Sequence, residues 1–294
     1  MADTPSNSAP PILLTVAGFD PSCGAGVSAD LKTFAAHNTY GVAAVTAITI
    51  QSTLGVSALH ITPANTLREQ LDALAGDLQI AAVKIGMLGS RANAVVVAEF
   101  LDKHKFEHVV LDPVIKPTSG SAELLDSAGI KFLREELAHR PLVLTPNVAE
   151  AELLTGMPIG NIAAMKEAAQ KLAALGAKAV IVTGGDLEKP VDVLCTGGAT
   201  MVFEGEHIRS ENTHGSGCAF SSALAAQLAL GQHIQQAVIL AKVYVTQAIA
   251  RSYAIGKGPG PLNHLFRYHM EPSTRGVHEV PQHGMHPAAE PSGH

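Results

Sequence analysis

The sequence predicts an α/β fold, a three-layer sandwich in which helices cover both faces of a mostly parallel central sheet. Short β-branched runs alternate along the chain with longer segments whose apolar residues recur at helical spacing. The predicted strands are almost continuously apolar, as strands are when helices bury both of their faces. Repeated strand–helix–strand order favours parallel strands joined by right-handed crossovers.

The predicted strands are rich in valine, isoleucine and threonine, and they cover residues 12–17, 42–50, 80–85, 108–112, 141–145 and 178–183. Helical spacing predicts helices between them at about 26–37, 63–76, 90–104, 121–138 and 161–175. In the last of these helices, Asn161 can cap the start and Gly176 can end it. Its shared face holds Ile162, Met165, Ala169 and Leu172.

The alternation changes after residue 183. Residues 190–204 predict a hairpin around Thr196-Gly197-Gly198, followed by helices at about 215–230 and 234–251. Because no repeat or linker divides the chain, we expect one domain over residues 11–270, with disordered ends at 1–10 and 271–294. The final segment carries four prolines and four histidines without regular spacing, so a solvated tail is favoured over a metal site.

The composition excludes several classes of protein. Of the 294 residues, 47% are hydrophobic and 16% charged, and the net charge of −6 is too small for a disordered chain of this apolar content. The slight acidity disfavours nucleic acid and anionic membranes as partners. No stretch reaches the ~18 apolar residues of a membrane span, and no basic residue precedes Lys32 to suggest a secretory signal. Cys23, Cys195 and Cys218 form no Cys-x-x-Cys pair, so we expect a soluble cytoplasmic protein with reduced thiols.

The turn after the first predicted strand is a candidate ligand-binding loop. It reads Gly18-Phe19-Asp20-Pro21-Ser22-Cys23-Gly24-Ala25-Gly26. Ligands of open α/β sheets bind beyond the carboxyl ends of strands, and glycines before a helix let the backbone approach them. The pattern matches neither the dinucleotide-binding motif nor the Walker motif. Asp30, one turn further on, can accept a hydrogen bond from an amine or hydroxyl; a tight turn with a solvated aspartate is the alternative.

A second glycine turn, Asn212-Thr213-His214-Gly215-Ser216-Gly217-Cys218, precedes a helix rich in small residues. Backbone N–H groups at such a helix start suit an oxyanion or a transferring phosphoryl group. Cys218 lies in the first helical turn, where we expect the dipole to lower its thiol pKa from ~8.5 towards neutrality and to make it a base or hydrogen-bond partner. The alternative is a buried small apolar residue. A thiol hydrolase using His214 and Cys218 is a competing hypothesis, disfavoured because the chain has no Gly-x-Ser-x-Gly elbow.

Two carboxylates at the ends of central strands suit a magnesium ion. Asp112 ends one predicted strand, and Glu150 follows Thr145-Pro146-Asn147 at the end of another. Mg²⁺ prefers oxygen ligands and keeps waters and substrate phosphates, whereas zinc favours a histidine and cysteine cluster that is lacking here. Alternatively, Glu150 only favours the start of its helix. The turn Val182-Thr183-Gly184-Gly185-Asp186 can pass beneath nucleotide phosphates or be a plain turn.

Seven segments extend these observations over about residues 12–265. They read G-F-D-P-S-C-G-A-G-V-S-A-D-L-K-T-F (18–34), A-I-T-I-Q-S-T (47–53), K-I-G-M-L (84–88), V-L-D-P-V (110–114), T-P-N-V-A-E-A-E-L-L-T-G (145–156), N-T-H-G-S-G-C (212–218) and G-K-G-P-G-P (256–261). Together they resemble the ribokinase-like superfamily and, within it, the hydroxymethylpyrimidine/phosphomethylpyrimidine kinases of thiamine biosynthesis. That resemblance implies that ATP phosphorylates the hydroxymethyl group of a pyrimidine and then the resulting monophosphate.

The resemblance also implies a role for each candidate residue. The pyrimidine is expected against Gly18, Ala25, Asp30, Gln51, Met87 and Val114, with Cys218 beside them as a catalytic residue. Gly215, Ser216 and Gly217 are expected to form the anion hole, and Thr145, Asn147, Thr183 and Gly185 to contact the ATP phosphates. Asp112 and Glu150 are expected to hold Mg²⁺. ATP is then the co-substrate, and we expect a homodimer with no nucleic acid or membrane partner.

The chain departs from the usual residues of this family in four places. Thr183 and Thr118 stand where lysines are usual, and Phe19 and Cys23 stand where a small polar residue and a glycine are common. Losing one cationic phosphate contact costs roughly 1–3 kcal/mol, and Lys116 can compensate if its loop folds over the site. The threonine at 183 also resembles pyridoxal kinases, so a pyridoxal kinase is the second hypothesis. A non-catalytic pyrimidine- or nucleotide-binding protein is the third.

Overall fold

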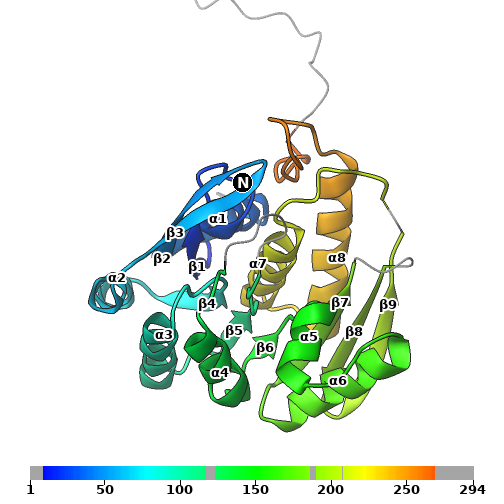
Figure 1. The fold of residues 1–294 in the computed structure, drawn as a ribbon, viewed down its shortest axis with the longest axis horizontal. Helices are drawn as coiled ribbons and strands as arrows, with labels where there is room; N and C mark the ends of the chain where they lie inside the picture. The colour runs from blue at the N-terminus through cyan, green and yellow to red at the C-terminus, as the bar shows by residue number, and fades with distance from the viewer. Residues whose placement is uncertain (1–8, 117–122, 186–189, 207, 269–294) are drawn as a thin grey trace, which may run out of the picture.

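The computed structural model describes residues 9–116, 123–185, 190–206 and 208–268, and within them nine strands form a single sheet (Figure 1). The strands, in chain order, are β1 (Ile12–Phe19), β2 (Tyr40–Ser52), β3 (Gly55–Ile61), β4 (Ile80–Ile85), β5 (His108–Leu111), β6 (Val143–Leu144), β7 (Ala179–Gly184), β8 (Val191–Thr196) and β9 (Ala199–Glu204). Their order across the sheet is β3-β2-β1-β4-β5-β6-β7-β8-β9. The run from β2 to β7 is parallel, whereas β3, β8 and β9 are antiparallel to their neighbours. The predicted mostly parallel sheet is therefore confirmed.

Helices cover both faces of this sheet, as predicted. They are α1 (Gly26–Ala36), α2 (Ala64–Asp77), α3 (Arg91–His104), α4 (Ser127–Glu135), α5 (Val148–Thr155), α6 (Ile162–Ala174), α7 (Ser216–Ala229) and α8 (Ile234–Ala250). One apolar cluster joins the sheet to α1, α7 and α8, and another joins it to α2 through α6 (Figure 1). The two clusters on opposite faces make the three-layer sandwich.

Several element boundaries follow the local signals in the sequence. The side chain of Asn161 accepts a hydrogen bond from the Ala164 N–H at 2.9 Å and caps α6, as predicted. Asn147 and Glu150 form a reciprocal capping box at the start of α5, and Gly156 ends that helix with a φ of +70°. On the face that Ile162 was expected to share with Met165, Ala169 and Leu172, the last three are buried, whereas Ile162 at the first turn is 41% exposed.

Three elements differ from the sequence-based expectation. The predicted helix over 121–138 begins only at Ser127, where Asp126 caps it, and ends in a 3-10 turn at Leu137–His139. The predicted strand over 141–145 pairs only at Val143–Leu144, because Pro141 and Pro146 have no N–H to donate. Strand β3 has no predicted counterpart, since it is an edge strand with mostly exposed positions and therefore lacks an apolar run.

This topology gathers the candidate residues at one edge of the sheet. The parallel strands β1, β4, β5, β6 and β7 all end there, and the start of α7 faces the same edge. All three cysteines are free thiols, as expected. In the described part of the chain, no helix combines the length and the apolar character that a membrane span requires. The expectations for residues 1–8, Thr118, Asp186 and 271–294 lie outside the described residues.

Candidate active site

A cavity of roughly 580 Å³ opens at the carboxyl edge of the parallel strands, a volume typical of small-molecule sites. Every predicted site residue except Asp30 lines it: Gly18, Ala25, Gln51, Met87, Asp112, Val114, Thr145, Asn147, Glu150, Thr183, Gly185, Gly215, Ser216, Gly217 and Cys218. These residues come from segments far apart in the sequence, so the strand ends and the start of α7 assemble a single site.

Asp30 does not line the cavity, so the expectation that Asp30 contacts a ligand is wrong. Its side chain is fully buried beneath the site, where Lys84 Nζ lies 3.0 Å from each carboxylate oxygen. The hydroxyls of Thr15 and Ser222 donate to the same carboxylate at 2.6 and 2.7 Å. With four contacts made inside the protein, Asp30 holds the layers of the fold together rather than a ligand.

Lys84 was missed by the sequence analysis. It is the one charged residue in the apolar run of β4, and it has no exposed surface. Burial alone would lower the pKa of Lys84, but the charges of Asp30, Cys218 and Asp112 and the hydrogen bond to Asp30 together exceed this effect, and the pKa is raised. A lysine inside a strand buried on both faces requires an acidic partner, and that rule was the available signal.

The Cys218 thiol is in the cavity but is not activated as expected. Burial raises its pKa to about 12, and this effect exceeds the opposing pull of the positive Lys84 charge. The expected lowering towards neutrality is therefore wrong, because the loss of hydration disfavours the charged thiolate at this position. The protonated thiol is suited to a hydrogen bond with a substrate hydroxyl.

Backbone donors for an anion lie next to this thiol. Gly215, with a φ of +83°, precedes α7, and the Ser216 N–H is already bonded to the Thr213 carbonyl at 3.1 Å. The N–H groups of Gly217 and Cys218 have no hydrogen-bond acceptor among the described residues. These two groups lie at the positive end of α7 and are candidate donors of the predicted anion hole, as is the Gly215 N–H, which likewise has no acceptor among the described residues.

Asp112 and Glu150 fit a magnesium ion that is shared with phosphates. Burial raises the pKa of Asp112, and burial together with the charge of Asp112 raises the pKa of Glu150 to about 8. One Glu150 oxygen accepts the Asn147 N–H at 2.9 Å, so the helix-start role left open by the sequence is present as well. Within the described ranges, no three His, Cys, Asp or Glu side chains form a metal cluster. Two crowded carboxylates with few other protein ligands match the preference of Mg²⁺ for water and phosphate.

Two lysines also line the cavity. Lys116 lines it, as does Lys242 of α8, which the sequence analysis did not single out. Lys242 Nζ lies 2.5 Å from Asp192, and Asp192 pairs in the sheet with Thr183. Because Lys242 is isolated on an apolar helix, only the spatial neighbourhood identifies it.

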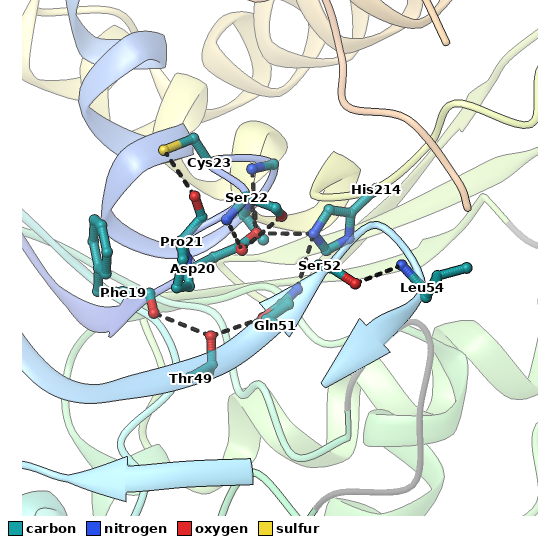
Figure 2. A network of polar contacts seen from close by, with 12 residues as sticks. Phe19, Asp20, Pro21, Ser22, Cys23, Thr49, Gln51, Ser52, Leu54 and His214 are labelled. Atoms are coloured by element: carbon teal, nitrogen blue, oxygen red, sulfur yellow. Dashed lines mark hydrogen bonds and ion pairs between the residues drawn. The ribbon is translucent and has the colours of Figure 1, made fainter. Parts of the chain in front are cut away.

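The first glycine turn is organised around Asp20 (Figure 2). Its carboxylate accepts hydrogen bonds from the N–H groups of Ser22, Gly24 and Ala25, and from the imidazole of His214. Burial alone would raise the pKa of Asp20, but the hydrogen bonds from His214 and Ser22 hold it below its ordinary value. Among the described residues, no hydrogen bond joins the His214 ring to the Cys218 thiol, so the structure gives the thiol-hydrolase hypothesis no support.

Cys23 occupies a position of this turn with a φ of +58°. This is the left-handed region that glycine favours, which matches the departure noted in the sequence. Its carbonyl accepts a hydrogen bond from Lys32 Nζ at 2.8 Å, and that contact helps to hold the turn.

Comparisons with known proteins identify the family of the chain. A family model described as phosphomethylpyrimidine kinase matches residues 20–263. The chain is 42% identical over 255 residues to the hydroxymethylpyrimidine/phosphomethylpyrimidine kinase of Bacillus subtilis, covering 86% of this chain and 94% of that protein. It is also 42% identical over 255 residues to the thiamine biosynthesis bifunctional protein ThiED of Geobacter sulfurreducens, but it spans only 52% of the length of that relative.

Two solved structures are similar over most of the chain. An ADP complex of Bacillus subtilis pyridoxal kinase has a TM-score of 0.82 and 37% identity, with 89% of this chain and 100% of that chain covered. The phosphomethylpyrimidine kinase of Clostridium difficile 630 has a TM-score of 0.72 and 38% identity, with 81% and 99% covered.

Proposed function

Because the chain belongs to the phosphomethylpyrimidine kinase family, we propose that its cavity carries out both phosphorylations of that family. ATP phosphorylates 4-amino-5-hydroxymethyl-2-methylpyrimidine, and a second turnover converts the monophosphate to the diphosphate for thiamine diphosphate biosynthesis. The protein is a phosphotransferase with ATP as its co-substrate.

One observation supports phosphoryl transfer in this cavity. Gly217 and Cys218, whose N–H groups have no acceptor within the described part of the chain, line the same cavity as Asp112 and Glu150. A γ-phosphoryl group needs positive backbone dipoles at its oxygens and a carboxylate-held Mg²⁺ at the phosphates. Catalysis in such a site is mainly positioning and charge neutralisation.

In the first step, the hydroxymethyl oxygen forms a bond to the γ-phosphorus while the bond from this phosphorus to the β-phosphate oxygen breaks, and ADP leaves. The hydroxyl proton passes to an oxygen of the transferred group. The neutral thiol of Cys218 orients the hydroxyl through a hydrogen bond, and it adds no negative charge when the substrate is already a monophosphate. Gly18, Ala25, Gln51, Met87 and Val114 hold the pyrimidine.

The co-substrate occupies the other part of the cavity. Thr145, Asn147, Thr183 and Gly185 contact its phosphates, and Lys116 and Lys242 provide positive charge near them. Asp112 and Glu150 would hold the Mg²⁺ that accompanies ATP and neutralises its phosphates when bound.

The remaining expectations also belong to this proposal. We treat residues 11–270 as one kinase domain that works in the cytoplasm, and we propose a homodimer. Ile48, Ile50 and Leu54 support the dimer, because they expose large apolar side chains on β2 and at its turn into β3, near the sheet edge. Light scattering on the purified protein tests the mass of the assembly.

The function is tested by substrate-dependent ADP formation with Mg-ATP. The purified protein is given the hydroxymethylpyrimidine, its monophosphate or pyridoxal, and phosphorylated products are identified by mass spectrometry. Turnover of both pyrimidines is the expected result. Turnover of pyridoxal alone would replace the proposal with a pyridoxal kinase, which the similarity to the solved pyridoxal kinase makes the second candidate. Pyrimidine binding by calorimetry without any phosphoryl transfer would indicate a binding protein.

A further inference from the structure

His214 joins three segments that line the cavity but are distant in sequence (Figure 2). Its Nε2 lies 3.0 Å from Asp20 Oδ2 in the β1–α1 turn and 3.1 Å from the side-chain amide of Gln51 on β2. Its own backbone directly precedes Gly215 and the anion-hole donors. The imidazole is buried, with only 10% of its side chain exposed.

The chemistry of a single imidazole nitrogen determines how these groups are arranged. Nε2 cannot donate to Asp20 and also accept a hydrogen bond from the Gln51 amide. In the structure the Gln51 nitrogen faces His214 and the Gln51 oxygen faces Thr49. A proton on Nε2 satisfies Asp20, and we therefore assign the Gln51 amide the exchanged orientation, with its carbonyl oxygen towards His214 and its NH₂ group towards Thr49. The Thr49 hydroxyl lies 3.0 Å from that amide and donates to the Phe19 carbonyl at 3.1 Å. The second N–H of the Gln51 amide then remains for the cavity.

Close packing keeps the imidazole in this position. A Cβ at Gly24 would overlap the His214 ring, and a Cβ at Gly215 would overlap the Gly24 carbonyl. The His214 N–H donates to the Gly260 carbonyl at 3.3 Å, which ties the same residue to the segment after α8. Both the backbone and the ring of His214 are therefore held.

We propose that His214, oriented by Asp20, is a positioning residue that couples recognition of the pyrimidine to placement of the phosphoryl group. It sets the orientation of the Gln51 amide, so that an N–H faces an acceptor nitrogen of the pyrimidine ring. It also holds Gly215 against the first glycine turn, which aligns the anion hole with the bound hydroxyl. This inference rests on the proposed function.

The first test compares His214→Ala and His214→Gln with the wild type in steady-state assays. Loss of the imidazole is expected to lower kcat/KM for the pyrimidine by about 10–100-fold, the range for one hydrogen bond to a charged group plus its neighbour. The KM for ATP should change less than about threefold. His214→Gln, which retains an N–H donor near the Nε2 position, should recover at least part of the loss. His233→Ala, at the exposed start of α8, is the matched histidine control and should behave as wild type.

The second test is a double-mutant cycle between His214 and Gln51. If His214 acts on the pyrimidine by orienting Gln51, the double alanine variant should raise the pyrimidine KM little more than Gln51→Ala alone, while its kcat falls further because Gly215 is released. Increases in the pyrimidine KM that multiply, or an equal rise in the KM values of pyrimidine and ATP, would overturn the coupling. Circular dichroism and thermal unfolding check folding, and if the alanine variant does not fold, His214→Gln and Asp20→Asn are measured in the same cycle. A wild-type protein without pyrimidine kinase activity would refute the proposed function itself, a result distinct from failure of the cycle.

Discussion

Replacement of Lys84 by methionine should unfold the protein at a much lower denaturant concentration. The Lys84 and Asp30 side chains are both fully buried, and Nζ lies 3.0 Å from each carboxylate oxygen. Removing one member of a buried ion pair leaves the other charge uncompensated, at a cost of about 3–5 kcal/mol. The hydroxyls of Thr15 and Ser222 still solvate Asp30, so we expect the lower half of that range. At about 2–4 °C per kcal/mol for a domain of this size, Tm should fall by roughly 6–16 °C.

The assay is guanidinium unfolding followed by circular dichroism, because the chain has no tryptophan for fluorescence. The double variant Lys84→Met/Asp30→Asn removes both charges and should recover part of the lost stability, since the amide oxygen still accepts from Thr15 and Ser222. Lys103→Met is the matched control: its partner Asp72 is solvent-exposed, and the midpoint should not move measurably. A loss below about 1 kcal/mol in Lys84→Met, or a double variant as unstable as the single one, would refute the buried-charge reasoning.

Three further predictions concern the site and its support. Cys218→Ser should retain at least about a tenth of the wild-type kcat, measured as ADP release. The reason is that a thiol with a pKa of about 12 acts through a hydrogen bond, which a hydroxyl can replace. A loss of kcat beyond about a thousandfold would instead require thiolate chemistry. Glu150→Gln should raise the Mg²⁺ concentration that gives the half-maximal rate by about tenfold. The unfolding midpoint should stay nearly unchanged, because the glutamine oxygen can still accept the Asn147 N–H. An unaltered dependence of the rate on Mg²⁺ would show that Glu150 does not bind the metal. Burial lowers the pKa of His264 from 6.5 to about 4. Between these pH values the unfolded chain binds a proton on His264 and the folded chain does not, so the free energy of unfolding decreases as pH falls from 6.5 towards 4. The full contribution of His264 to the free energy of unfolding is roughly 3 kcal/mol. The guanidinium unfolding midpoint of His264→Gln should therefore depend less on pH over this range than that of the wild type, and an equal pH dependence would contradict the prediction.

The parts of the site that the sequence predicts well are those encoded by local chemistry. Glycine turns after apolar strands and before a helix identify the loops at 18–26 and 212–218, and parallel topology then requires their strand ends to meet. Carboxylates that follow a predicted strand can likewise be identified from the sequence. For this reason Asp112 and Glu150, predicted from separate segments, line one cavity.

What the sequence could not predict depends on burial and on neighbours distant in the chain. Asp30 has the same local pattern whether it faces a ligand or a lysine, and only the packing of β4 beside α1 and α7 brings Lys84 to it. The helix position of Cys218 predicts a lowered thiol pKa, but the loss of hydration there is a property of the assembled cavity. Lys242 becomes relevant only because α8 lies beside β8 in space.

The contacts of the segment after α8 also determine when the site can form during synthesis. His214 bonds to Gly260, and the N–H groups of Lys257 and Gly258 donate to the Thr53 hydroxyl at the turn between β2 and β3. Translation proceeds at about 5–20 residues per second, so the glycine turn at 18–26 waits roughly 10–50 s for residue 261. During that interval the strands from β1 to β7 can pair, whereas the cavity has no wall on its α7 side. A ligand can therefore bind the complete cavity only after nearly all of the kinase fold has left the ribosome.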